Sequence, residues 1–221
     1  MTYKYGLDPL SMKGSIKNVG GRFNMGELVN PNLPRFPALY IASDRATAML
    51  ERFGSRQPEE ADLSRLDLAL TAKGSVSIVA VSGRLERYLD VGDAASLKPF
   101  VDLIKGFKLP QHVRQMARKR GEPPPEIVRT PAKLVASLLA SNWRAMPMLI
   151  DVPANSQIFG HIASEVGIDG IVYPSVRGGG RCVAVFPHSF IHTESFVELA
   201  DESPREDVRR RIDASNCTEF C

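Results

Sequence analysis

The chain has 221 residues, of which 43% are hydrophobic and 24% are charged. These proportions are ordinary for a globular protein and exclude a chain that is disordered throughout or collagen-like. No apolar run approaches the ~18 residues that a membrane-spanning helix needs, and the first residues lack the apolar stretch of a secretory signal. Three cysteines are too few for a disulfide framework. Together these features predict a cytoplasmic protein without contact to a membrane.

The net charge of +3 is too small to indicate nucleic-acid binding by itself, but the charge is unevenly distributed. Residues 105–133 carry eight Lys and Arg and two Glu. A basic block of this kind can bind phosphate groups, although it is more often the solvated face of a helix. We therefore expect no direct nucleic-acid binding, with binding through residues 105–133 as an alternative.

The first predicted elements are a strand and the helix that follows it. Ala38–Ala42 is a short apolar run typical of a buried strand. A helix is expected next, with Ser43 as its N-cap, Asp44 in its first turn and Gly54 as its stop. Its apolar stripe should consist of the residues at helical spacing, namely Ala46, Met49, Leu50 and Phe53.

The middle of the chain is expected to be mostly helical. A strand is predicted at 76–81, and residues 89–91 should lie beside the sheet. Between residues 95 and 145, one helix should run over 111–120. Another should begin with Thr130 as its cap and Pro131 at its first position, because an amide hydrogen there would be left unsatisfied.

The last third of the chain combines strands with helices. Strands are predicted at 148–152, 170–173 and 182–186. A helix is predicted at 155–166, where Gly167 ends it. After Ser203 the sequence has the pattern of a capping box and predicts a short charged helix. Because strands and helices do not alternate regularly, we predict an α+β fold rather than a doubly wound sheet.

Two further motifs do not support a nucleotide-triphosphate site or a metal site. Residues 178–180 are three glycines followed by a predicted strand, whereas a phosphate-cradling loop needs Lys and Ser or Thr at the start of a helix. His188 and His192 lack the neighbouring glutamate and the third ligand of a zinc site. We expect no bound metal.

Three short segments carry side chains that suit a small-molecule site. Arg22 follows two glycines, and Glu51 lies in the first predicted helix eleven residues after Tyr40. Ser175 and Arg177 follow a predicted strand. Taken singly, each has an ordinary explanation, since arginine and glutamate are usually exposed and a turn serine usually bonds the backbone.

In this order, the three segments resemble the RES family, which is named for an arginine, a glutamate and a serine. Arg22 in the sequence GRFN, Glu51 in LER and Ser175 in YPSVR look like the family residues. The resemblance covers roughly residues 16–91 and 148–187. The stretch 92–147 departs from it, because it looks longer than the family's usual connection.

The family's members are toxin components of Xre–RES bacterial toxin–antitoxin pairs. The resemblance implies a fold related to ADP-ribosyltransferases, with a split mixed or antiparallel sheet that is flanked by helices and grips NAD+. It implies that NAD+ is consumed as the substrate and that growth of the host stops. It also implies a cognate Xre-type helix-turn-helix antitoxin that blocks the site and through which any contact with DNA occurs.

The expected domain organisation follows from the resemblance. Residues 1–200 form a single RES-type NAD-binding domain with a mainly helical insertion at about 92–147. Residues 201–221 form a charged C-terminal tail.

The residue types suit cleavage of the nicotinamide–ribose bond of NAD+. Nicotinamide leaves as a neutral molecule, so the main demand is to stabilise the oxocarbenium-like charge on the ribose. The resemblance implies catalytic roles for Arg22, Glu51 and Ser175. It implies contacts to NAD+ from Arg22, Tyr40, Ser175 and Arg177. Glu51 would stabilise the developing charge, and Arg22 would grip a phosphate.

The predicted function is therefore an NAD+ glycohydrolase or phosphorylase that depletes NAD+. One alternative is a mono-ADP-ribosyltransferase that uses the same site to modify a host protein. Another is a non-enzymatic binding protein that uses the basic residues 105–133.

Overall fold

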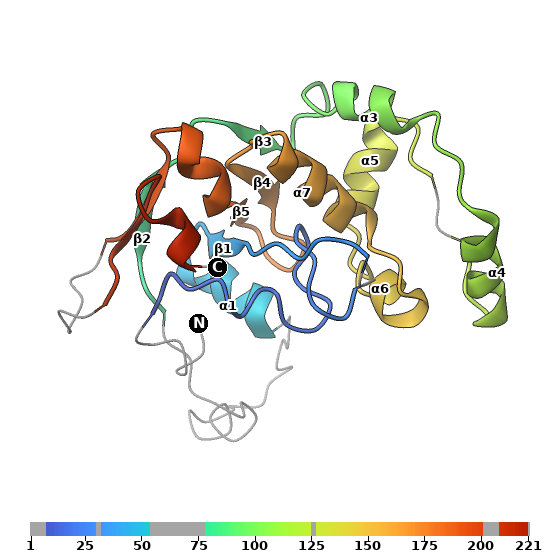
Figure 1. The fold of residues 1–221 in the computed structure, drawn as a ribbon, viewed down its shortest axis with the longest axis horizontal. Helices are drawn as coiled ribbons and strands as arrows, with labels where there is room; N and C mark the ends of the chain where they lie inside the picture. Colours follow the sequence, from blue (N-terminus) through green and yellow to red (C-terminus); the bar gives the residue numbers. More distant parts are fainter. Residues whose placement is uncertain (1–7, 30–31, 54–77, 125–126, 201–207, 221) are drawn as a thin grey trace, which may run out of the picture.

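Two β-sheets organise the structure, a computed structural model that describes residues 8–29, 32–53, 78–124, 127–200 and 208–220 (Figure 1). The four-stranded mixed sheet has the order β1 (Leu39–Ala42), β5 (Arg181–Val185), β4 (Gly170–Pro174) and β3 (Tyr88–Asp90). In it, β3 and β4 are parallel and the other neighbours are antiparallel. The three-stranded antiparallel sheet has the order β2 (Val81–Arg84), β6 (Phe196–Leu199) and β7 (Arg211–Ile212). The predicted α+β class is confirmed.

The helices are arranged around these sheets and beyond one end of them (Figure 1). They are α1 (Arg45–Phe53), α3 (Lys98–Ile104), α4 (Gln111–Lys119), α5 (Pro131–Leu138), α6 (Ala145–Ile150), α7 (Asn155–Glu165), η2 (Pro187–His192) and η3 (Cys217–Phe220). α7 contacts β4, α5 contacts α7, and α3 contacts α5. α4 contacts α6 and lies at the outer end of the molecule, away from both sheets. Within the described residues, no helix combines the length and the apolar character needed to cross a membrane.

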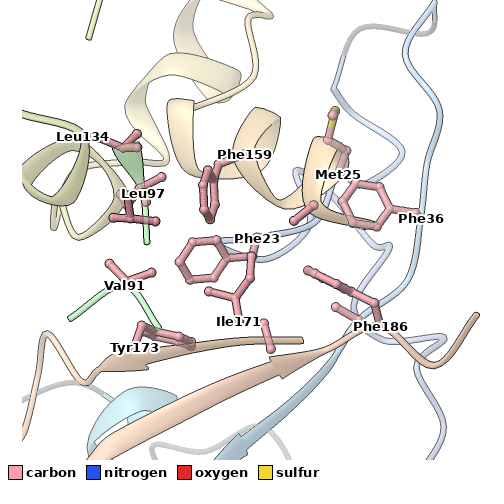
Figure 2. Packing of buried hydrophobic residues seen from close by; sticks show 14 of the residues in the cluster. Phe23, Met25, Phe36, Val91, Leu97, Leu134, Phe159, Ile171, Tyr173 and Phe186 are labelled. Atoms are coloured by element: carbon pink, nitrogen blue, oxygen red, sulfur yellow. The ribbon is translucent and has the colours of Figure 1, made fainter. Parts of the chain in front are cut away.

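The main hydrophobic core lies between α7 and the four-stranded sheet (Figure 2). Phe23 is fully buried in it, with its ring centroid 4.9 Å from that of Tyr173 and 6.5 Å from that of Phe159. The ring of Phe159 in turn lies 4.7 Å from that of Phe100. These edge-on pairs bury large apolar surfaces in favourable geometry. Because Phe23 directly follows Arg22 in the chain, the core also fixes the position of that arginine.

A second core joins the two ends of the described chain. Leu10 and Met12 are buried together with Ile212, Cys217 and Phe220, against residues of β5 and β6. The Met12 amide also donates a hydrogen bond to the Phe220 carbonyl at 3.3 Å. Residues 208–220 therefore contribute buried side chains to the second core.

This packing differs from the charged tail expected at 201–221. The described part of that segment, residues 208–220, forms β7 and η3. The capping box and the start of the helix predicted after Ser203 lie outside the described residues. The buried residues of 208–220 stand singly among charged ones and form no periodic pattern, so the sequence does not indicate their burial.

Several predicted elements are confirmed to within one or two residues. They are the strands at 38–42, 170–173 and 182–186, the segment at 89–91, and the helices at 111–120 and 155–166. α5 begins as predicted, because Thr130 Oγ1 accepts a hydrogen bond from the Lys133 amide at 3.2 Å and Pro131 is the first helical residue. α7 is followed by Gly167, whose φ of 78° is easily reached by glycine.

The N-cap of α1 is Asp44 and not Ser43, so that prediction is wrong. The Asp44 carboxylate accepts hydrogen bonds from the Thr47 amide at 2.8 Å and from the Thr47 hydroxyl at 2.7 Å. These bonds lower the pKa of Asp44, and a charged cap of this kind suits a helix N-terminus. The side chain of Phe53 and the predicted stop at Gly54 lie outside the described residues.

The covered face of α1 is also rotated from the predicted stripe. Ala46 is exposed and Thr47 is buried, whereas Met49 and Leu50 are half-buried. Residues four apart lie on one face of a helix, so Glu51 shares its face with buried Thr47. Glu51 is accordingly half-buried rather than solvated.

Two predicted strands are placed differently. β2 begins at Val81, so the described part of 76–81 that precedes it is not strand, and residues 76–77 lie outside the described residues. Pairing with β6 sets the extent of β2. The strand predicted at 148–152 is wrong, because α6 extends to Ile150 and Asp151 ends it with a φ of 53°. A short apolar run does not by itself distinguish a strand from a buried helix.

Candidate active site

A cavity of about 420 Å³ brings together segments that are far apart in the sequence. It is lined by Arg22, Tyr40, Glu51 and Arg177, which come from the N-terminal loop, β1, α1 and the turn after β4. Ser175 is not among the lining residues, but its hydroxyl donates a hydrogen bond to Glu51. The structure therefore gathers in one place all five residues singled out in the sequence.

Asn24 holds the loop that carries Arg22. Its side chain is fully buried, and its Oδ1 accepts hydrogen bonds from the Gly21 amide at 2.9 Å and from the Tyr40 hydroxyl at 2.8 Å. Its Nδ2 donates to the Phe36 carbonyl at 3.1 Å. A Cβ at Gly21 would collide with the Tyr40 hydroxyl, so the loop needs glycine there.

Gln157 fixes the same loop from α7. Its side chain is fully buried, and its Nε2 donates to the carbonyls of Val19 at 2.7 Å and Asn24 at 3.0 Å. Its Oε1 accepts a hydrogen bond from the Ala154 amide at 3.1 Å and so satisfies the start of α7. Gly160, one turn later, lets the helix approach the Phe23 carbonyl, because a Cβ there would collide with it. Neither Asn24 nor Gln157 was predicted, since a buried amide looks like a surface residue in a single sequence.

Arg22 is buried and is itself held by the backbone. It is 7% exposed, and its Nη1 donates to the carbonyls of Leu138 and Ala140, both at 2.9 Å. Burial lowers the pKa of Arg22, and the nearby Tyr173 and Glu51 partly oppose this effect. One nitrogen of the guanidinium is therefore committed to the end of α5. This arginine is not the exposed turn residue that its surroundings in the sequence suggest.

Glu51 is positioned from two sides. The Ser175 hydroxyl donates a hydrogen bond to Glu51 Oε1 at 2.6 Å, and Arg177 Nη1 donates to the Glu51 carbonyl at 3.1 Å. Ser175 Oγ in turn accepts from the amides of Arg177 at 3.2 Å and Gly178 at 3.0 Å. Ser175 thus has its ordinary turn role and also orients the carboxylate.

Tyr40 presents its ring to the cavity and its hydroxyl to the protein. The side chain is partly exposed, while the hydroxyl accepts from the Phe23 amide at 2.9 Å and donates to Asn24. Burial raises the pKa of Tyr40 well above its usual range, so the phenol is neutral at physiological pH.

We expect the Tyr40→Phe variant to be less stable by about 1–3 kcal/mol, because the Phe23 amide is left without its acceptor in a part-buried position. Urea denaturation measures this difference. Tyr88→Phe is the matched control, since Tyr88 is exposed and its variant should lie within about 0.5 kcal/mol of the wild type. Equal stability of the two variants would contradict the anchoring role of Tyr40.

Trp143 and Arg144 also line the cavity, and the sequence analysis missed them. Trp143 is buried, and the guanidinium carbon of Arg144 lies 4.4 Å from its ring centroid. The guanidinium carbon of Arg22 lies 5.9 Å from the same ring. The available signal was that Trp143 is the chain's single tryptophan and stands next to an arginine.

The charges around the cavity are unbalanced. Four arginines line it, at positions 22, 52, 144 and 177, and Glu51 is the one acidic residue among the described lining residues. Cys182 also lines the cavity, but burial raises its pKa to about 11, with a further contribution from Glu51. Its thiol is therefore protonated at neutral pH, which disfavours a thiolate nucleophile.

A comparison with models of known protein families identifies the family of this chain. A model of the RES domain matches residues 2–204. The chain belongs to the RES domain family. Membership is consistent with an NAD+-acting domain associated with toxin–antitoxin pairs. The match runs through residues 92–147, the stretch that the resemblance left unassigned. Searches of curated proteins and of solved structures found no match, so the relation to ADP-ribosyltransferases stays a prediction.

Proposed function

We propose that this RES domain protein cleaves the nicotinamide–ribose bond of NAD+ and transfers ADP-ribose to water or phosphate. The observation that carries the proposal is the Glu51 carboxylate, which faces a cavity rich in guanidinium groups and is oriented by Ser175 at 2.6 Å. NAD+ has matching chemistry, because it combines a sugar that becomes cationic during cleavage with a diphosphate that carries negative charge.

Glu51 is suited to stabilise the transition state of this reaction. As the bond to nicotinamide breaks, its electron pair leaves with nicotinamide, and positive charge develops on the ribose ring. An oxygen of water or phosphate then forms the new bond to ribose C1, and an attacking water releases its proton. A carboxylate already fixed beside this charge needs no reorganisation during the step.

The other residues support binding and position. Tyr40 offers its ring to the nicotinamide or the ribose, while its hydroxyl keeps the arginine loop in place. Ser175 orients Glu51, and Arg22 and Arg177 bring positive charge close to the same carboxylate. Arg177 and Arg22 are the proposed partners for the phosphates.

The test is to incubate the purified protein with NAD+ and to quantify nicotinamide and ADP-ribose, with and without inorganic phosphate. We expect release of nicotinamide together with free ADP-ribose or its phosphorylated form. Label from NAD+ that stays on a protein would instead support the mono-ADP-ribosyltransferase alternative. If no nicotinamide is released above the level of a heat-inactivated sample, the proposed activity is wrong.

The proposal includes a biological setting in which NAD+ consumption arrests the host. Expression of the chain alone should stop bacterial growth and lower cellular NAD+. Co-expression of a cognate Xre-type helix-turn-helix protein should restore both, because the partner is proposed to cover the cavity. Growth arrest with normal NAD+ would separate toxicity from the proposed reaction.

A further inference from the structure

The segment 138–144 closes one side of the cavity, although it belongs to the stretch that the family resemblance did not cover. The backbone carbonyls of Leu138 and Ala140 accept both hydrogen bonds from Arg22 Nη1, each at 2.9 Å. Ser141, Trp143 and Arg144 then line the cavity. The buried Arg22 is thereby tied to a segment that has its own charged and aromatic side chains.

Among the arginines that line the cavity, Arg144 combines an aromatic support with a guanidinium that is not held by the protein's own acceptors. Within the described chain its guanidinium makes no hydrogen bond or ion pair, whereas Arg22 and Arg177 each donate to backbone carbonyls. Its planar group lies over Trp143, with 4.4 Å from the guanidinium carbon to the ring centroid. An aromatic face at this distance holds a guanidinium in place while its N–H donors stay available.

The charges nearby favour an anion at this position. Partial burial and, second to it, the positive charge of Arg177 lower the pKa of Arg144, and Tyr40 and Glu51 partly oppose them. Two guanidiniums that repel each other across a cavity are stabilised when a multiply charged anion lies between them. Glu51 lines the same cavity, but among the described residues no carboxylate forms an ion pair with Arg144.

We infer that Arg144, supported by Trp143, is a further arginine that binds the diphosphate of the substrate at this cavity, beside Arg22 and Arg177. The inference rests on the proposed function for the choice of NAD+, but the anion subsite itself does not depend on catalysis. Segment 138–144 would then be part of the binding site rather than a peripheral insertion. Arg22 acts on this subsite through the backbone of residues 138–140, which it anchors.

The experiment uses inorganic pyrophosphate and ADP-ribose as probes, with affinities measured by calorimetry on the full chain. Arg144→Gln should weaken both affinities by about 10- to 30-fold, the loss expected for charge-assisted hydrogen bonds. Arg144→Lys should recover only part of the loss, because an ammonium lacks the planar fork. Arg35→Gln is the control, because Arg35 is exposed and does not line the cavity, and this variant should bind like the wild type.

The kinetics of NAD+ cleavage give a second measurement. The diphosphate keeps its charge while the glycosidic bond breaks, so Arg144→Gln should raise KM for NAD+ and change kcat little. Pyrophosphate affinity in Arg144→Gln within twofold of the wild type would overturn the inference, as would a wild type that does not bind pyrophosphate. If pyrophosphate binding depends on Arg144 but NAD+ is not cleaved, the proposed function fails and the anion subsite stands.

Discussion

Glu51→Gln should release nicotinamide from NAD+ about 10²- to 10³-fold more slowly than the wild type, a loss of about 3–4 kcal/mol in transition-state stabilisation. The positive charge on the ribose develops only during bond breaking, so the affinity for NAD+ itself should change far less. The glutamine oxygen can still accept the hydrogen bond that Ser175 donates to Glu51 Oε1 at 2.6 Å. The free energy of unfolding should therefore change by less than about 1 kcal/mol. Nicotinamide release, NAD+ affinity and melting temperature are the three measurements.

Glu165→Gln provides the matched control for this substitution. Glu165 is an exposed residue at the end of α7 and does not line the cavity, so its loss of charge should leave nicotinamide release unchanged. Similar rates for Glu51→Gln and the wild type would remove Glu51 from the mechanism. A large fall in melting temperature in Glu51→Gln would indicate a structural role instead.

The helices and strands with a regular signal were predictable from the sequence. The start of α5 is marked by the N-cap Thr130 and by Pro131 at the first helical position, and α7 is followed by Gly167, which has a positive φ. The strand predicted at 148–152 is wrong, because an apolar run of that length occurs in helices as well as in strands, and Met148 and Leu149 are exposed on α6. The packed end of the chain was missed since Cys217 and Phe220 are buried by contacts with residues near position 10, which no local pattern reveals.

The residues of the candidate site could be predicted from the sequence, but the hydrogen bonds that hold them in place could not. The order of Arg22, Glu51 and Ser175 indicated a family, and the structure brings these residues together. The supporting roles of Asn24 and Gln157 could not be predicted, because they consist of buried hydrogen bonds. Those of Gln157 join residues that are more than 100 positions apart in the sequence. The role of residues 138–144 was hidden for the same reason, since backbone carbonyls carry no sequence signal.

Arg22→Ala is expected to affect stability and binding together. Leu138 and Ala140 each lose the donor that satisfies their carbonyls, and a large buried side chain leaves a void, so unfolding should become easier by about 2–4 kcal/mol. The affinity for NAD+ should fall by a similar ~2–4 kcal/mol, because a guanidinium at the cavity and the anchored position of segment 138–144 are lost at once. Urea denaturation and calorimetry with NAD+ measure the two effects separately.

Arg22→Lys distinguishes charge from shape in this dual role. An ammonium has the same charge but cannot donate from one planar group to two carbonyls and to a ligand, so we expect little recovery of either quantity. If Arg22→Lys restored stability but not NAD+ affinity, anchoring of residues 138–140 would need only a hydrogen-bond donor. Binding of NAD+ would in that case need the planar guanidinium. Unchanged stability in Arg22→Ala would contradict the anchoring of residues 138–140. If the folded fraction of Arg22→Ala bound NAD+ with unchanged affinity, the role of Arg22 would be to anchor residues 138–140. The phosphates would then be bound by the other arginines of the cavity.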